Sequence, residues 1–303
     1  MSATANTTRA ELPAAVTDQV WRLLRATPAI PAYRSALATA LRLPGNILSD
    51  APNTRWARPV WTCCAAAGGD VEQAVPIAAA VEIFMVALDL LDDAEDGEET
   101  AIQAELGASC ALNVSTGLLF LAQQGLLDAG GGAALAHLLL DAGLRACGGQ
   151  HEDLSAGMGS PTSLDAALDV TSGKSASLVA AICQLGAACA GAGAWAQDLF
   201  ARFGWYLGMV AQLVNDLNAL QLEAVGKTDI ALGRLTLPLV HAALLAPCAA
   251  TEMDIRAAVW SRGPAQLTWA VAKTYRGHAL DLIPHLTANY DSGVALAALL
   301  PCL

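Results

Sequence analysis

The sequence predicts an all-α fold, a bundle of about ten to twelve helices in a single domain. The composition is 55% hydrophobic, 5% aromatic and 15% charged, so Ala, Leu and Val dominate the expected core. Ala and Leu are among the best helix formers, and β-branched runs are scarce. Long apolar-periodic segments are separated by short Gly, Pro and Asp breaks, and no alternating strand pattern persists.

Each apolar-periodic segment between two breaks is predicted as a helix. In chain order these helices span 14–26, 31–43, 54–68, 71–95, 101–127, 131–158, 162–192, 195–224, 234–247, 251–261, 265–284 and 291–300. The segments 71–95 and 195–224 are long and apolar almost all round, which places them at the centre of the bundle. No shift in composition marks a linker, so residues 1–303 form one predicted domain, with 1–13 as a flexible N-terminal tail.

Charge and cysteine usage bound the partners and the compartment. The net charge of −12 argues against nucleic acid and against an anionic membrane surface. Residues 1–18 lack the apolar core of a signal peptide. Residues 178–196 are long enough for a membrane span but contain Gln184 and mostly Ala and Gly, so we expect a buried helix and no integral membrane segment. The eight cysteines form no C-x-x-C pair, which favours free thiols and a cytoplasmic location.

Four aspartates share one side of the helix predicted at 71–95. Asp89, Asp92, Asp93 and Asp96 fall at i, i+3, i+4 and i+7. Carboxylates at this spacing repel one another, and oxygen ligands of this kind suit Mg²⁺ or Mn²⁺. The alternative is a solvated helix end, because the acidic run continues through Glu98 and Glu99.

A second polar group in an apolar helix favours the metal interpretation. Gln212, Asn215, Ala219 and Glu223 lie on or near one face of the helix predicted at 195–224, and Asp216 lies beside it. Two such groups in one bundle are expected to face each other at the mouth of the fold.

These motifs resemble the trans-polyprenyl diphosphate synthase superfamily from about Arg55 to Pro238. Asp92, Asp93 and Asp96 match its first Asp-Asp-x-x-Asp motif. Three further blocks match in order: Gly149–Leu154 (Gly-Gln-x-x-Asp-Leu), Gly173–Ala176 (Lys-Thr-Ala/Ser) and Asp229–Pro238 (Asp-Leu-x-x-Gly-Lys-x-Thr-Leu-Pro). The resemblance implies the isoprenoid synthase fold around a central apolar cavity, an isoprenoid diphosphate substrate and a homodimer.

The same resemblance implies roles for individual residues. Lys174 and Lys227, assisted by Arg234, would neutralise the diphosphate as catalytic cations. Further contacts to the substrate would come from Arg55, Arg58, Gln150 and Gln212. The Mg²⁺ ligands would be Asp92, Asp93, Asp96, Asn215, Asp216 and Glu223.

Two departures from the family pattern direct the predicted activity. The second motif reads Asn-Asp-x-x-Ala-x-x-x-Glu and resembles the Asn/Ser/Glu metal triad of class I terpene synthases, with Ala219 in the Ser position. The segment 98–107 is acidic where chain-elongating synthases carry an Arg-Arg-Gly that binds a second diphosphate. The main expectation is therefore a terpene cyclase, a lyase that ionises and cyclises an allylic diphosphate. The small Ala87 and the medium Leu88 before the first motif favour geranylgeranyl over farnesyl diphosphate.

Two alternatives stay open. The first is a prenyltransferase, either a polyprenyl diphosphate synthase or an enzyme with an unusual acceptor such as a peptide or indole. The intact first motif and the pair Arg55/Arg58 favour it. The second is a non-catalytic regulatory subunit of a prenyl synthase. Such subunits typically lose the first motif and carry Cys-x-x-x-Cys pairs, whereas this chain keeps the motif and spaces Cys183 and Cys189 differently.

Overall fold

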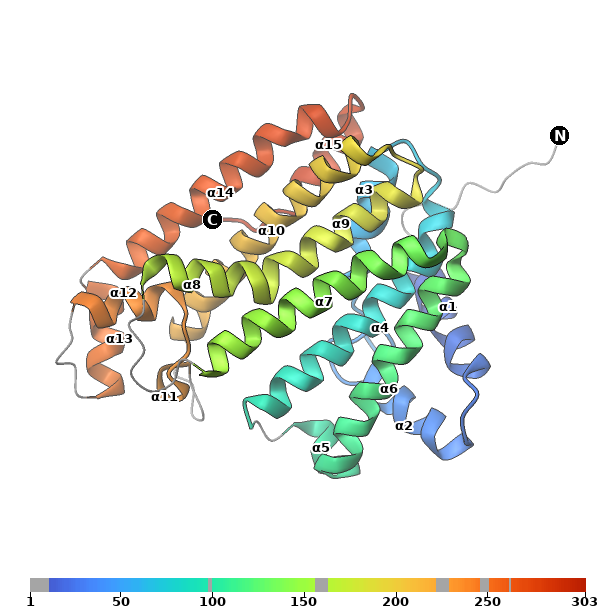
Figure 1. Ribbon diagram of the computed structural model, residues 1–303, viewed down its shortest axis with the longest axis horizontal. Helices are drawn as coiled ribbons and strands as arrows, with labels where there is room; N and C mark the ends of the chain where they lie inside the picture. Colours follow the sequence, from blue (N-terminus) through green and yellow to red (C-terminus); the bar gives the residue numbers. More distant parts are fainter. Residues whose placement is uncertain (1–10, 98–99, 156–162, 222–228, 246–250, 262) are drawn as a thin grey trace. The chain divides into compact units, whose positions relative to one another are not determined.

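The computed structural model describes residues 11–97, 100–155, 163–221, 229–245, 251–261 and 263–303. These residues form helices joined by turns and contain no strand, which confirms the all-α prediction (Figure 1). Two compact units are interleaved along the chain: 1–137 with 185–192, and 138–184 with 193–303. The expectation of one domain over 1–303 stays a prediction.

The first unit is built around a long helix that is buried on all sides. This helix, α4 (Val71–Glu95), has the predicted bounds, and every residue from Ile77 to Ala87 is buried. It lies beside α6 (Ala108–Leu126), as Figure 1 shows. The other elements of this unit are α1 (Leu12–Ala26), α2 (Pro31–Leu41), α3 (Ala57–Ala66), α5 (Ala101–Leu106) and the π-helical segment η1 (Leu127–Gly131).

Local capping chemistry sets several helix ends in the first unit. The Asp70 Oδ1 atom accepts from the Glu72 backbone N–H at 3.0 Å and starts α4. Thr100 and Gln103 form a capping box at the start of α5. Gly107 then adopts φ +81°, a left-handed conformation that ends α5. The single helix predicted over 101–127 is therefore two helices.

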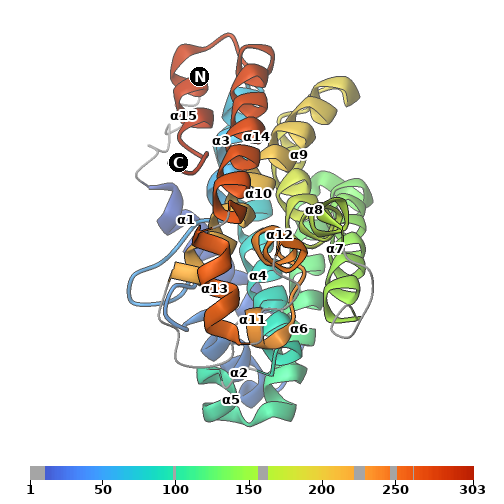
Figure 2. The same cartoon turned by 90° about the vertical axis from the view of Figure 1, so that its left-hand side faces the viewer.

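The second unit is organised around α10 (Ala194–Gln221) and α14 (Pro264–Leu286), which run side by side (Figure 1). Leu213 and Leu217 of α10 lie in two buried apolar clusters of this unit. Figure 2 shows α12 and α13 next to α14. The remaining elements are α8 (Leu164–Thr171), the π-helical segment η2 (Ser172–Ala176), α11 (Asp229–Leu232), α12 (Leu237–Leu245), α13 (Glu252–Ser261) and α15 (Tyr290–Ala297).

Two helices contribute residues to both units, α7 (Gly132–Ser155) and α9 (Ser177–Cys189). The helix predicted over 162–192 is divided into α8, η2 and α9, because the chain widens into one π-helical turn at 172–176. Such turns occur mostly as single insertions in α-helices and frequently at functional sites.

Length and hydropathy alone would let two helical runs cross a membrane, namely α4 and Ala108–Ser155. In α4, 72% of the apolar window is buried inside the protein, as in the core helix of a soluble protein. Two such helices are weak evidence for a membrane span.

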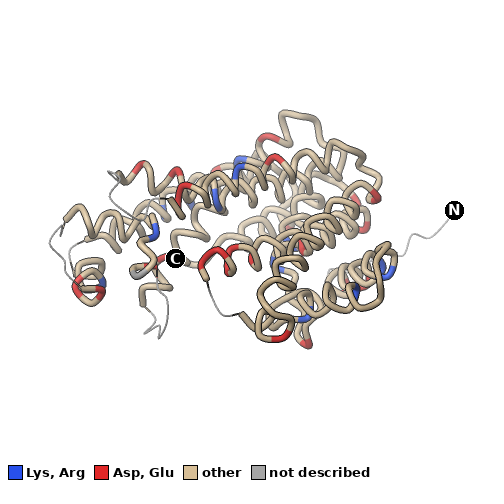
Figure 3. The backbone as a smooth tube through the Cα atoms, turned by 60° about the horizontal axis from the view of Figure 1, so that its bottom comes forward, with Lys and Arg blue, Asp and Glu red and all other residues tan. Residues whose placement is uncertain are grey.

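Acidic residues outnumber basic residues in the chain by 28 to 16. In Figure 3, red (Asp and Glu) accordingly outweighs blue (Lys and Arg) along the backbone.

Candidate functional site

The first aspartate-rich motif lies at the C-terminal end of α4. Asp92, Asp93 and Asp96 are half-buried, and the Asp96 backbone N–H donates to the Asp92 carbonyl at 2.9 Å. No basic residue lies in the last turn of α4. The C-terminal end of a helix carries partial negative charge, so these carboxylates place further negative charge at an end that is already negative. The arrangement favours a bound cation.

The donor set of this motif fits Mg²⁺. Within the described residues, no group of three or more His, Cys, Asp and Glu side chains is placed to hold a metal. Mg²⁺ does not need such a cage, because it commonly binds through one or two carboxylates together with substrate phosphates and water. Asp92, Asp93 and Asp96 offer the hard oxygen donors that this mode of binding uses.

Arg55, a predicted substrate ligand, forms an ion pair with Asp89. Its Nη2 atom lies 2.9 Å from Asp89 Oδ2, and the two side chains are 56% and 46% exposed. The Arg55 guanidinium also lies over the Trp56 ring, 4.7 Å from its centroid. Arg58 is exposed on α3. Asp89, which the family motif does not cover, therefore neutralises a cation of the expected substrate site.

Glu82 is a buried acid that sequence reasoning did not assign to the site. Its Oε1 atom accepts the backbone N–H groups of Trp56 and Ala57 at 2.9 and 2.7 Å, at the start of α3. Burial raises the pKa of Glu82 to about 7, although the two N–H donors act to lower it. In the sequence, the signal for Glu82 was that it is a single acidic residue within the apolar segment of α4.

In the second unit, one buried carboxylate holds two of the predicted cations. Asp153 Oδ2 lies 3.7 Å from Lys174 Nζ and 3.7 Å from Arg234 Nη1. Asp153 Oδ1 accepts the Leu235 backbone N–H at 2.8 Å, which ties α7 to the turn before α12. The structure brings Lys174 and Arg234, two of the sequence-predicted site residues, together at Asp153. Asp153, the aspartate of the Gly-Gln-x-x-Asp-Leu block, was not predicted as a site residue.

Gln150 precedes Asp153 by three residues on α7 and is buried. Neither atom of its side-chain amide has a hydrogen-bond partner among the described residues. Burial of an amide without partners is costly, so such groups in native proteins call for an explanation. A bound ligand would supply the missing partners, which agrees with the predicted role of Gln150 in substrate binding.

The polar residues of the second motif differ in their exposure to solvent. Asp216 is buried, whereas Asn215 and Ala219 are exposed on α10. The Gln212 Nε2 atom donates to Asp216 Oδ1 at 2.8 Å, and Gln212 Oε1 accepts from Ser175 Oγ at 2.8 Å. Glu223 and Lys227 lie outside the described residues.

Burial raises the pKa of Asp216 to about 7. The Gln212 amide and Lys174 lower it, while Asp229 and Asp153 raise it further. The second motif therefore contributes a buried carboxyl group, and the charge of the predicted cation Lys174 acts on its pKa.

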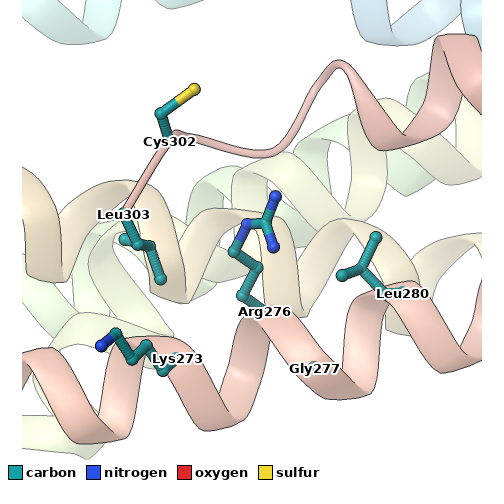
Figure 4. A pocket seen from close by; sticks show the side chains of 6 residues that line it. All are labelled: Lys273, Arg276, Gly277, Leu280, Cys302 and Leu303. Atoms are coloured by element: carbon teal, nitrogen blue, oxygen red, sulfur yellow. The ribbon is translucent and has the colours of Figure 1, made fainter.

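A separate cavity of about 460 Å³ lies in the second unit, and none of the predicted site residues lines it (Figure 4). It is lined by Lys273, Arg276, Gly277, Leu280, Cys302 and Leu303. The Arg276 Nε atom donates to the Pro301 carbonyl at 3.3 Å.

Comparison with known proteins gives a family match and several relatives. The polyprenyl synthetase family model matches residues 54–258. The geranylgeranyl diphosphate synthase of Mycobacterium tuberculosis is 32% identical over 222 residues, which cover 69% of this chain and 62% of that protein. The tryptophan prenyltransferase ComQ of Bacillus spizizenii is 29% identical, covering 57% of this chain and 60% of that protein. The chain thus spans about three fifths of the length of these curated relatives.

Solved structures share the fold. A polyprenyl synthase from Caulobacter crescentus CB15, complexed with calcium and isoprenyl diphosphate, aligns with a TM-score of 0.77 and 24% identity over 96% of this chain and 92% of that one. This likeness supports the predicted isoprenoid synthase fold.

The expectation of a terpene cyclase was wrong. The relatives are diphosphate synthases and a prenyltransferase, which transfer a prenyl group to an acceptor. That expectation rested on the resemblance of the second motif to a terpene-synthase metal triad, with Ala219 in the Ser position, and on the acidic segment after the first motif, which had suggested a lost acceptor. The matched relatives favour the alternative instead, a prenyltransferase.

Proposed function

The chain belongs to the polyprenyl synthetase family, and from that premise we propose that it is a prenyltransferase that extends an allylic diphosphate with isopentenyl diphosphate. The observation that carries the proposal is the buried cluster in which Asp153 holds Lys174 and Arg234. In a chain of net charge −12, the cluster brings two of the 16 basic residues together at one buried carboxylate. An anionic diphosphate is the ligand that such a cluster favours.

The proposed reaction begins when the allylic C–O bond breaks and its electron pair leaves with the diphosphate. Lys174 and Arg234 stabilise the departing charge, which lowers the barrier to ionisation. The double bond of isopentenyl diphosphate then attacks the allylic cation and forms a new C–C bond. The resulting tertiary cation then gives a proton to the released diphosphate, which restores a double bond, and the product is an allylic diphosphate five carbons longer.

Mg²⁺, or Mn²⁺ in its place, would be held by Asp92, Asp93 and Asp96 and would supply positive charge to the diphosphate. Asp216 is a further proposed ligand from the second motif, and Asn215 is exposed beside it. Gln150 and Gln212 would bind the substrate through their amides.

A second candidate acceptor is an aromatic side chain such as tryptophan. Arg55, the residue expected to bind a second diphosphate, is paired with Asp89. The segment that follows the first motif is acidic instead of basic. A neutral acceptor requires no second anion site, and the relative from Bacillus spizizenii is named as a tryptophan prenyltransferase.

In the deciding experiment, the purified chain is incubated with Mg²⁺ and an allylic diphosphate, either farnesyl or geranylgeranyl diphosphate. Three acceptor conditions are compared: isopentenyl diphosphate, a tryptophan-containing peptide and no acceptor. Products are identified by mass spectrometry. Longer diphosphates that form only with isopentenyl diphosphate support chain elongation, and a prenylated peptide supports the second candidate. Asp92→Ala should abolish turnover, whereas Asp128→Ala, at an exposed position of η1, should not. Activity retained in Asp92→Ala would contradict the metal assignment.

We also propose a homodimer in the cytoplasm. Leu112, Phe120 and Leu127 are 52%, 66% and 53% exposed along α6 and the start of η1, and apolar side chains of this size are typical of covered surfaces. Light scattering should give twice the chain mass of 31.1 kDa. A mass of one chain at micromolar concentration would contradict the dimer.

A further inference from the structure

The π-helical segment η2, which carries Lys174, is in close backbone contact with two helices of its unit. A Cβ atom on Gly149 of α7 would fall against the Lys174 backbone nitrogen. A Cβ atom on Gly208 of α10 would lie 2.7 Å from Ala176 Cα. Two glycines therefore let α7 and α10 approach the backbone on either side of Lys174. The backbone position of Lys174 is set by these neighbours.

Side-chain hydrogen bonds from α10 add to the π-helical backbone bonds of η2, such as the bond from the Ser177 N–H to the Ser172 carbonyl. The Trp205 Nε1–H group donates to Ser172 Oγ at 2.9 Å, and Ser175 Oγ donates to Gln212 Oε1 at 2.8 Å. Both bonds reach η2 from α10, and they bracket Lys174 on its two sides. Ser177 Oγ donates in addition to the Gly173 carbonyl at 2.6 Å.

The Trp205 ring is itself held in one orientation. Tyr206 and Tyr275 each meet it edge-on, with centroids 5.4 Å away and interplanar angles of 72° and 85°. Edge-to-face pairs of this kind are favourable beyond the area they bury. The indole N–H is thereby directed at Ser172, and Trp205 is half-buried.

We propose that Trp205 is a positioning residue, which fixes η2 through Ser172 and so holds the Lys174 ammonium group where it binds the substrate diphosphate. The inference rests on the proposed function, because it takes Lys174 as the diphosphate ligand. A π-turn closes through i→i−5 backbone bonds in place of the i→i−4 bonds of an α-helix, and the side-chain bonds from α10 tie this turn to its neighbour. Loss of the indole donor leaves Ser172 without this tie to α10 and lets the backbone at Lys174 shift.

The test measures the affinity of inorganic diphosphate with Mg²⁺ by calorimetry, which requires no turnover. Trp205→Phe keeps an aromatic ring in place and removes the donor, and Ser172→Ala removes the acceptor. Ser172→Thr restores the hydroxyl. Trp195→Phe is the matched control, because Trp195 lies on the same helix and is 73% exposed. Lys174→Ala sets the affinity expected when the ammonium group is absent.

We expect Trp205→Phe and Ser172→Ala each to weaken diphosphate binding about 3- to 10-fold, the effect of one hydrogen bond. The double variant should be no weaker than either single variant, and Ser172→Thr should bind as the wild type does. Thermal midpoints separate loss of affinity from loss of folding. If Trp205→Phe does not fold, the diphosphate affinity of Ser172→Ala alone tests the positioning role.

Unchanged affinity in Ser172→Ala, with wild-type binding intact, overturns the positioning role and leaves the proposed function standing. Additive losses in the double variant overturn it as well, since the two groups would then act separately. If the wild type does not bind diphosphate, or Lys174→Ala binds equally well, the proposed function fails together with the inference.

Discussion

The ion pair between Arg55 and Asp89 is the residue contact that bears most directly on the choice of acceptor. Arg55 precedes α3, and Asp89 lies three residues before Asp92 on α4. Because the Asp89 carboxyl group lies 2.9 Å from the Arg55 guanidinium, it lowers the attraction of Arg55 for any further anion. The pair is exposed, so this effect is moderate.

Removal of the Asp89 charge should therefore strengthen binding of the second diphosphate. In Asp89→Asn we expect the KM for isopentenyl diphosphate to fall about 2- to 5-fold, in keeping with the small energies of exposed ion pairs. The KM for the allylic substrate should not change. Steady-state kinetics at fixed Mg²⁺ measure both, with Asp128→Asn as control. An unchanged or higher KM for isopentenyl diphosphate would show that Arg55 does not bind it.

Sequence patterns predicted the cations of the candidate site but not the way they are held. Lys174 and Arg234 were chosen because they match family blocks, and both contact Asp153. Asp153 was visible in another matched block, Gly149–Leu154, and was not selected. Trp205 and Ser172 carry no motif, and their contact depends on a π-turn that changes which face each residue presents. Helical periodicity assumes 3.6 residues per turn and cannot anticipate that change.

At the scale of elements, Glu82 joins two helices of the first unit. It lies in the buried run of α4, and its carboxyl accepts the N–H groups of Trp56 and Ala57 at the start of α3. The start of a helix favours negative charge, whereas burial disfavours it. Burial is the larger effect, and the pKa is raised to about 7.

This raised pKa makes the stability of the protein depend on pH. The folded state keeps the Glu82 proton up to about pH 7, whereas the unfolded chain releases it near 4.5. The contribution of Glu82 to stability is therefore fully present below about pH 4.5 and is lost as the pH rises through about 7. In Glu82→Gln, which does not titrate, the free energy of unfolding relative to wild type should rise between pH 5 and pH 8, by roughly 3 kcal/mol at most.

Urea unfolding of the ligand-free protein at several pH values measures this difference. Glu105→Gln, at an exposed position of α5, is the control for removal of an acidic side chain. A difference for Glu82→Gln that does not change with pH would contradict the raised pKa of Glu82.

The close approach of α7 to η2 gives a second prediction for an element. In Gly149→Ala, the new methyl group would meet the Lys174 backbone nitrogen and would lie 2.9 Å from the Gly173 carbonyl carbon. Backbone atoms cannot turn aside as a flexible side chain can, so we expect a loss of about 1–3 kcal/mol in the free energy of unfolding. Diphosphate affinity should fall too, because Lys174 must move.

Gly148→Ala is the matched control on the same helix. No atom lies within 4 Å of a Cβ at Gly148, and Ala is the better helix former. Its free energy of unfolding should rise by about 0.5–1 kcal/mol, with diphosphate affinity unchanged. Equal stability of the two variants would contradict the tight contact at Gly149.

Helix positions were predictable where apolar pattern and capping agree. The bounds of α4 match because Asp70 caps its start and Gly97, at φ +65°, follows its end. The break at Gly107 was missed because apolar spacing continues across it, and only the left-handed conformation of the glycine divides α5 from α6. The division of the helix predicted over 162–192 was missed for a related reason, because no change in residue composition marks the π-turn at 172–176.

At the scale of the whole molecule, a net charge of −12 works against binding of any anion. The proposed function requires a diphosphate ligand, so the protein would have to overcome this repulsion locally. In the second unit the cations on Asp153 would supply positive charge, and in the first unit a divalent cation on the Asp92–Asp96 turn would do so. Composition alone gave the fold class, but the preference for transfer over cyclisation depended on the relatives, because cavity shape is not encoded in short motifs.

The balance of charge predicts that metal and diphosphate stabilise the protein only together. A ligand at 100 times its dissociation constant adds about 2.7 kcal/mol to the free energy of unfolding, which for a chain of this size raises Tm by roughly 5 °C. We expect this rise with Mg²⁺ plus inorganic diphosphate, and little change with Mg²⁺ alone or with diphosphate and EDTA. Differential scanning calorimetry provides the measurement, and Asp92→Ala should lose the rise whereas Asp128→Ala keeps it. Equal stabilisation by diphosphate in EDTA would mean that the cations bind the anion without a metal.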